Sequence, residues 1–176
     1  MLSDDVRGTR TVQYETKEQD RLEALRGYNL LDTAPEPDFD ALVRDAAVLF
    51  DAPIALISLV DEDRQWFKAV VGLEAVETPR SVSFCAHAIR SGDVYVVEDA
   101  LCDPVFANNP LVKGDPNIRF YAGAPIETSD GHRLGTICVI DGKPRCTLTA
   151  SQSQALKEFA RKAMALIEAR KKIDVQ

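Results

Sequence analysis

The sequence has little of what metal centres and disulfide frameworks require. It holds only two histidines and four cysteines, with no C-x-x-C pair among them: His87, His132, Cys85, Cys102, Cys138 and Cys146. A zinc site takes three or four protein ligands, and the closest pairing here, Cys85 with His87, offers two. We therefore predict no metal and no disulfide, with the cysteines packed as free thiols in a reducing cytosol.

Long apolar runs and an excess of basic charge are also absent. No stretch approaches the roughly 20 apolar residues that cross a bilayer, and the polar N-terminus has no segment resembling a secretory signal. The net charge of -7 argues against nucleic acid or an anionic membrane as a partner. We therefore expect a cytoplasmic protein.

The chain is long enough for one domain with a proper core. It has 176 residues, of which 45% are hydrophobic and 28% charged, as in ordinary globular proteins. We expect the domain over residues 17–172, with a flexible tail at 1–16 and another at 173–176. The tail at 1–16 is predicted because that segment is polar and lacks periodicity.

The segment 118–141 is the feature around which the rest is organised. It reads as two strands joined by a short turn, for which Asp130-Gly131 supplies the positive φ angles. Alternation places Phe120, Ala122, Ala124 and Ile126 on one face of the first strand, with Tyr121 and Gly123 on the other. In the second strand it places Leu134, Thr136, Cys138 and Ile140 on one face and Ile137 and Val139 on the other. Both faces of that strand are apolar, which indicates a central strand.

The remaining elements follow from periodicity and from turn residues. Amphipathic stripes predict helices over 17–31, 37–50 and 150–172, the last with a capping box from Thr149 to Gln152. Apolar runs predict a strand hairpin over 54–71 and a strand over 94–97. A short helix over 83–90 would be capped by Ser81 or Ser83. The long connection 98–117 is expected to be a binding loop or lid, or to carry short helices.

This order of elements predicts the fold class. Strands that arrive in hairpins form an antiparallel sheet, so the fold is α+β. The amphipathic helices would cover one face of the sheet. Loops and the short helix would cover the other and leave room for a small molecule.

Seven short motifs follow one another along the chain: APIALISLVD at 52–61, QWFK at 65–68, SFCAH at 83–87, VEDA at 97–100, NPLV at 109–112, RFYAGAP at 119–125 and LGTICVID at 134–141. Together they resemble the GAF domain, in the subgroup found at the N-terminus of bacterial sensor histidine kinases and diguanylate cyclases. The resemblance implies a GAF/PAS-like antiparallel sheet of five or six strands, in the order 2-1-5-4-3, with a ligand pocket on one face. One departure is Val105, since related sequences often carry arginine after Asp-Pro, so the ligand here differs or is absent.

The resemblance implies a sensory module rather than an enzyme. It would bind an unknown small ligand or a partner domain, work as a homodimer, and relay the signal through its terminal helices to an output domain such as a histidine kinase or diguanylate cyclase. No output module follows the last helix, so we expect an excised or a stand-alone sensor domain. The predicted ligand-binding residues are aromatic or polar side chains near strand ends and on the long loop, with two cysteines: Trp66, Phe84, Cys85, Asp99, Phe106, Arg119, Tyr121 and Cys138.

No cofactor is predicted. Covalent bilin attachment typically uses a cysteine directly followed by histidine, and here Ala86 separates Cys85 from His87. The signature of cyclic-nucleotide-binding relatives is not visible. Two alternatives stay open. Some GAF-fold proteins are thiol-dependent free methionine-R-sulfoxide reductases, for which Cys85 would be the strongest candidate. The other alternative is a dimerisation scaffold whose pocket is filled by side chains.

Overall fold

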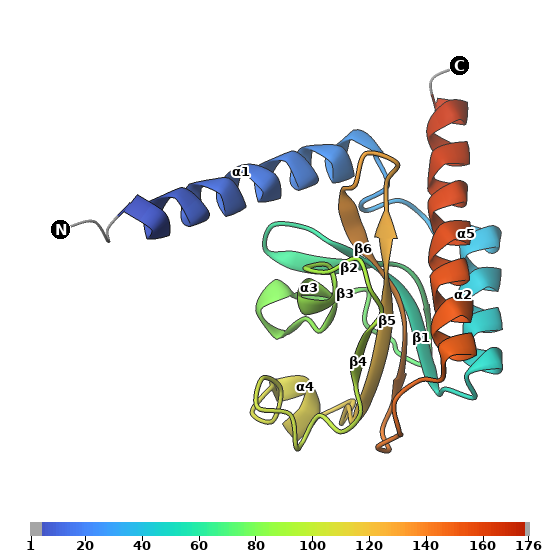
Figure 1. Ribbon diagram of the computed structural model, residues 1–176. Helices are drawn as coiled ribbons and strands as arrows, with labels where there is room; N and C mark the ends of the chain where they lie inside the picture. Colours follow the sequence, from blue (N-terminus) through green and yellow to red (C-terminus); the bar gives the residue numbers. More distant parts are fainter. Residues whose placement is uncertain (1–4, 175–176) are drawn as a thin grey trace.

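An antiparallel sheet of six strands separates two layers of different character (Figure 1). The computed structural model describes residues 5–174. Two helices cover one face of the sheet, and short helices and loops cover the other. The α+β class and the uneven covering of the two faces are therefore as predicted.

The strands are β1 Ile54–Val60, β2 Arg64–Val71, β3 Glu77–Pro79, β4 Tyr95–Val97, β5 Phe120–Glu127 and β6 Arg133–Asp141. Their order across the sheet is β3-β2-β1-β6-β5-β4, with every pairing antiparallel. Without the three-residue β3 this is the predicted order 2-1-5-4-3. The sequence did not predict β3, because its residues, Glu77, Thr78 and Pro79, form no apolar run of the kind that predicted β4.

The helices are α1 Asp5–Gly27, α2 Pro37–Leu49, the 3-10 turn η1 Arg80–Val82, α3 Cys85–Ala88, α4 Pro110–Lys113 and α5 Ala150–Asp174. The predicted capping box is confirmed at α5. Thr149 Oγ1 accepts from the Gln152 amide, and Gln152 Oε1 accepts from the Thr149 amide. At α3 the Ser83 hydroxyl, not that of Ser81, accepts from a helix amide. None of the helices in the described range is long and apolar enough to cross a membrane.

The N-terminal prediction is wrong for residues 5–16, which continue α1 instead of forming an irregular tail. This segment lacks an apolar stripe, but its one glycine, Gly8, is the only strong helix breaker in it. The prediction for residues 1–4 and 175–176 lies outside the described residues. The helix also ends at Gly27, earlier than expected, because Asn29 and Asp32 adopt positive φ angles in the connection to α2.

The hairpin of β5 and β6 departs from strict alternation at one end. A bulge between Ile126 and Glu127 leaves Leu134 without a partner in the ladder. Leu134 therefore packs in the same core as Ile137 and Val139, not on the face of Cys138 as predicted. The turn prediction is also half wrong, since Gly131 has φ of +90° but Asp130 has no positive φ.

Each face of the sheet has its own apolar core. On the helical face, α2 and α5 cover the side chains that point from the strands, among them Phe120, Ile137 and Trp66. On the other face, α3, α4 and the loops cover a second core that includes Phe84, Phe106 and Tyr121. Helices present broad apolar stripes and fill the first side closely, whereas short turns span the second less completely.

Candidate functional site

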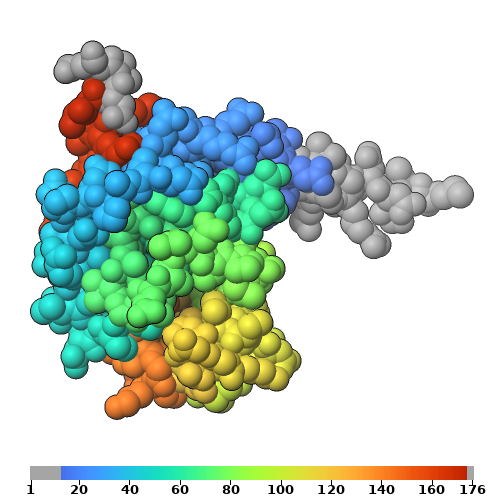
Figure 2. Space-filling view, turned by 180° about the vertical axis from the view of Figure 1, so that it is seen from behind, coloured from blue at the N-terminus to red at the C-terminus, as the bar shows by residue number. Residues whose placement is uncertain are grey.

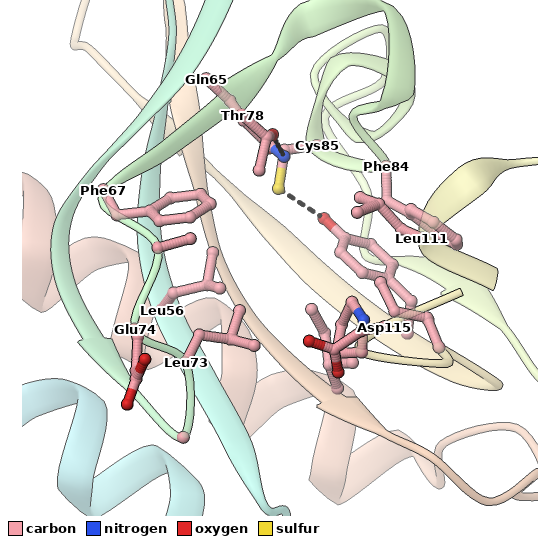
Figure 3. Close-up of a pocket in the computed structure, with 16 residues that line it drawn as sticks. Leu56, Gln65, Phe67, Leu73, Glu74, Thr78, Phe84, Cys85, Leu111 and Asp115 are labelled. Carbon is pink, nitrogen blue, oxygen red and sulfur yellow. Dashed lines mark hydrogen bonds between the residues drawn. The ribbon is translucent and has the colours of Figure 1, made fainter. Parts of the chain in front are cut away.

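A cavity of about 370 Å³ lies on the loop-covered face of the sheet. The short helices and loops over this face form the roof of the cavity. Figure 2 shows a hollow between the green segment and the yellow segment of this roof. Most of its lining is apolar and comes from β1, β2, β5, β6 and the roof: Leu56, Phe67, Leu73, Phe84, Leu111, Ile118, Tyr121 and Ile140. Gln65, Thr78 and Cys85 add polar groups at one end, and Glu74 and Asp115 carry carboxylates away from that end (Figure 3).

The polar end of the cavity is organised around the Gln65 side chain. Its Oε1 accepts hydrogen bonds from the hydroxyls of Ser83, at 2.7 Å, and Ser58, at 3.1 Å. Its Nε2 donates to Thr78 Oγ1 at 2.5 Å. The amide thus ties β1, β2, β3 and the start of α3 together beneath the cavity, and satisfying these buried groups fixes their positions.

Cys85 is the polar side chain with the most unusual surroundings. It is 2% exposed and its sulfur points into the cavity (Figure 3). The hydroxyls of Thr136 and Tyr121 donate to Sγ at 3.1 and 3.3 Å. Cys138 belongs to the same buried cluster as Cys85. Two hydroxyl donors that converge on one sulfur favour its anionic form.

The surroundings shift the pKa values of the two buried cysteines in opposite directions. Burial alone would raise the pKa of Cys85, but the hydrogen bonds from Cys138, Thr136 and Tyr121 outweigh it and hold that pKa below the usual range. Burial, followed by the hydrogen bond to Cys85, raises the pKa of Cys138 well above the usual range. Burial and the neighbouring sulfurs likewise raise the pKa of Tyr121. Cys85 is therefore the more acidic thiol of the pair and Cys138 the less acidic one.

Aromatic rings form the wall behind Cys85. The rings of Phe84 and Phe106 stack with centroids 3.9 Å apart and planes 7° from parallel. Tyr121 tilts against Phe84, with centroids 5.3 Å apart. Contacts between aromatic rings add to the stability that burial alone provides. The wall is consequently a fixed surface.

The predicted site residues separate into two groups. Phe84, Cys85 and Tyr121 line the cavity, and Phe106 and Cys138 stand directly behind them. The other three lie elsewhere. Trp66 packs in the helical-face core. Asp99 accepts from the Leu101 amide in an exposed turn, and Arg119 donates to the carbonyls of Val112 and Ile118.

Sequence reasoning missed several residues of the lining. Leu56, Phe67 and Ile140 were assigned to strands but not to the cavity, because alternation does not say which face carries the roof. Gln65 had a signal that could have found it. It lies two positions before Phe67 on β2, so alternation places both side chains on one face, and buried polar groups often mark sites.

Within residues 5–174, no group of three or more histidine, cysteine, aspartate or glutamate side chains could hold a metal ion. All four cysteines are free, with Cys85 and Cys138 buried and Cys102 and Cys146 exposed.

The family model for the GAF domain matches residues 35–167, which include the whole sheet and both layers. The chain belongs to the GAF domain family. A cyclic di-GMP phosphodiesterase, PA2567 of Pseudomonas aeruginosa, is 45% identical over 157 residues, 89% of this chain. The chain spans 27% of the length of that relative.

Two solved structures show how widely this GAF fold is shared. The GAF domain of an Acinetobacter phosphoenolpyruvate-protein phosphotransferase aligns with a TM-score of 0.63 and 19% identity, over 86% of this chain and 93% of that one. A type II free methionine-R-sulfoxide reductase from Thermoplasma acidophilum aligns with a TM-score of 0.60 and 15% identity, over 74% of this chain and 89% of that one. At such identities the likeness concerns the fold alone.

Proposed function

We propose that this GAF domain is a sensory module that binds a small molecule in the cavity over β1, β2, β5 and β6 and relays its presence through α1 and α5. The observation that carries the proposal is the cavity itself, which combines apolar walls with a hydrogen-bonded polar end. Cavities of this size and composition are typical of small-molecule sites. The 45% identity to a signalling protein also supports a sensory role.

The lining favours a compact ligand without negative charge. None of the described residues that line the cavity is basic, while Glu74 and Asp115 carry carboxylates. A phosphate-bearing ligand such as a cyclic nucleotide would face these carboxylates without a compensating cation. A neutral or cationic molecule with an apolar body fits, with a polar group that reaches Gln65 or Thr78.

Native mass spectrometry of freshly purified protein tests the proposal, followed by melting of the protein with a panel of neutral and cationic metabolites. We expect a retained mass or a rise in melting temperature with at least one compound. Ala75→Trp would fill the cavity and abolish that rise. Val76→Trp is the matched control, because Val76 is 66% exposed and does not line the cavity. No retained mass and no rise with any compound would favour the dimerisation scaffold.

The relay rests on connections between the cavity and the helices. Arg80 directly follows β3, whose Thr78 lines the cavity, and its Nη1 donates to Glu18 of α1 at 2.6 Å. On the other side, α5 packs against β5 and β6, which supply Tyr121 and Ile140 to the cavity. A ligand that moves these strands or β3 would therefore move both helices. The helices would pass the change to an output domain such as a histidine kinase, a diguanylate cyclase or a phosphodiesterase.

The homodimer and the cytoplasmic location stay predictions. In Figure 1, α1 extends away from the sheet and α5 rises beyond it, so both offer surface to a second copy. Two-fold pairing is the commonest arrangement of oligomers. Light scattering at tens of micromolar protein tests it, and a monomer would remove the relay through paired helices.

A free methionine-R-sulfoxide reductase is the second candidate, because Cys85 faces the cavity with Cys138 behind it. The assay supplies free methionine-R-sulfoxide with a thioredoxin regenerating system. Turnover that disappears in Cys85→Ser would replace the sensor assignment with an enzymatic one. We expect no turnover, since the kinship at 45% identity is with a signalling protein.

A further inference from the structure

Cys85 and Cys138 differ in what can reach them. Cys85 begins α3 in the roof and its sulfur lines the cavity. Cys138 lies in the middle of β6, has no exposed surface, and is not part of the lining. It nevertheless lies in the same buried cluster as Cys85, two residues along β6 from Thr136, whose hydroxyl donates to the Cys85 sulfur. A small reagent in the cavity therefore meets Cys85 first and finds Cys138 directly behind it.

The geometry points to a further function for this pair: Cys85 is a hydroperoxide-reactive thiolate and Cys138 is its resolving thiol, so that hydrogen peroxide entering the cavity converts them to a disulfide between α3 and β6. This goes beyond the proposed ligand binding, which would hold whether or not the pair reacts. The bond would join the roof to the central strand, and it would close the polar end of the cavity.

The chemistry balances in two steps. The Cys85 thiolate attacks one oxygen of hydrogen peroxide, the O–O bond breaks, and the departing hydroxide takes a proton to become water, which leaves Cys85 as sulfenic acid. Cys138 then attacks the Cys85 sulfur, the S–O bond breaks, and a second water leaves. One peroxide is reduced while two thiols are oxidised to one disulfide. An external dithiol restores both thiols by exchange.

The neighbouring side chains suit each sulfur to its role in the reaction. The hydroxyls of Thr136 and Tyr121 donate to Cys85 and stabilise the anion that attacks. The titratable groups that contact Cys85 are Tyr121 and Cys138, both with pKa values raised well above their usual range, so both keep their protons at neutral pH. Of the carboxylates in the same cavity, Glu74 and Asp115, neither is hydrogen-bonded to Cys85.

The experiment uses the full chain with Cys102→Ser and Cys146→Ser, which removes the two exposed thiols. The protein is treated with one equivalent of hydrogen peroxide, quenched with N-ethylmaleimide, and measured by intact mass and peptide mapping. We expect a product lighter by two hydrogens, resistant to N-ethylmaleimide, with Cys85 and Cys138 peptides linked, and restored by dithiothreitol. Two thiols that remain free to alkylation after unfolding would overturn the inference.

Single variants separate the two roles. In Cys138→Ser the reaction should stop at a Cys85 sulfenic acid that dimedone traps, and in Cys85→Ser the Cys138 thiol should stay unoxidised. Oxidation of Cys138 in Cys85→Ser, or no dimedone adduct in a folded Cys138→Ser, would contradict the assignment.

Thr136→Val keeps both cysteines and removes one donor to Cys85. Oxidation should slow several-fold, and the midpoint of its pH dependence should move upward. An unchanged rate and midpoint would show that the donor set does not prepare Cys85, and the inference would fail even if a disulfide forms slowly.

Discussion

The phenol of Tyr121 lies over Gly123, two residues along the same face of β5. A β-carbon on Gly123 would stand 2.2 Å from the Tyr121 hydroxyl oxygen and 2.7 Å from the ring carbon that bears it. The missing side chain lets the ring lie along the strand, and the hydroxyl thereby reaches Cys85. The space at Gly123 is therefore filled neither by a ligand nor by another strand, but by the aromatic ring that organises the polar end of the cavity.

Gly123→Ala is expected to displace the Tyr121 ring. Because Tyr121 is only 1% exposed, its ring can move only by disturbing Phe84, and overpacking of this kind costs about 2 kcal/mol. Urea denaturation measures the change in the free energy of unfolding. Gly27→Ala is the control, since a β-carbon there meets no atom within 4 Å. Equal stability of the two variants would show that the ring does not depend on Gly123.

Gly135→Ala should cost more, about 3 kcal/mol or above. A β-carbon at Gly135 would lie 1.8 Å from the carbonyl oxygen of Ser58 on β1. The main chain of the central β1–β6 pair must then move, because the clashing atom belongs to the backbone and not to a flexible side chain. Thermal and urea unfolding of the purified variant check this, and a loss below that of Gly123→Ala would contradict it.

Glu18→Gln should destabilise the protein by about 2 kcal/mol at neutral pH, with allowance for partial solvent screening. Burial alone would raise the pKa of Glu18, but the guanidinium groups of Arg21 and Arg80 outweigh it and lower the pKa to about 2. The unfolded chain takes up the proton near the ordinary value of 4.5. The contribution is thus complete above that value and is lost as the pH falls toward 2.

The measurement is urea denaturation of wild type and Glu18→Gln between pH 7 and the acid limit. The two curves of stability against pH should converge as the pH falls. Glu23→Gln, an exposed position on the same helix, should leave stability nearly unchanged throughout. A constant difference between wild type and Glu18→Gln at all pH values would contradict the ion-pair explanation.

Lys68→Met is expected to cost about 3 kcal/mol. The Lys68 side chain has no exposed surface, and its Nζ donates to Thr33 Oγ1, the Ala34 carbonyl and Glu36. Methionine fits the space but leaves the Thr33 and Ala34 oxygens without this donor, while Glu36 keeps only Arg170 of its two cationic partners. Lys157→Met, which removes an exposed contact with Asp93 at 3.4 Å, should change the free energy of unfolding by less than about 0.5 kcal/mol.

Local patterns predicted what depends on the near neighbours of each residue. The apolar run at 54–60 gave β1, the box from Thr149 to Gln152 capped α5, and the alternation of Phe120 to Ile126 assigned the faces of β5. Sequence patterns failed where the structure depends on strand pairing or on tertiary packing. Leu134 changed face because of a bulge, and α1 extends toward the N-terminus through a segment without an apolar stripe.

The chain by itself determined the sheet, its two apolar faces and the family, because hydrophobic period and motif order are properties of the sequence. The sequence also identified Phe84, Cys85 and Tyr121 as candidate site residues. Tertiary structure alone decided that Trp66 faces the helices while Gln65 faces the cavity. It also decided that Cys85, 53 residues before Cys138, lies in the same buried cluster as that residue. Contacts between residues so far apart arise only when the strands pair, since no local preference encodes them.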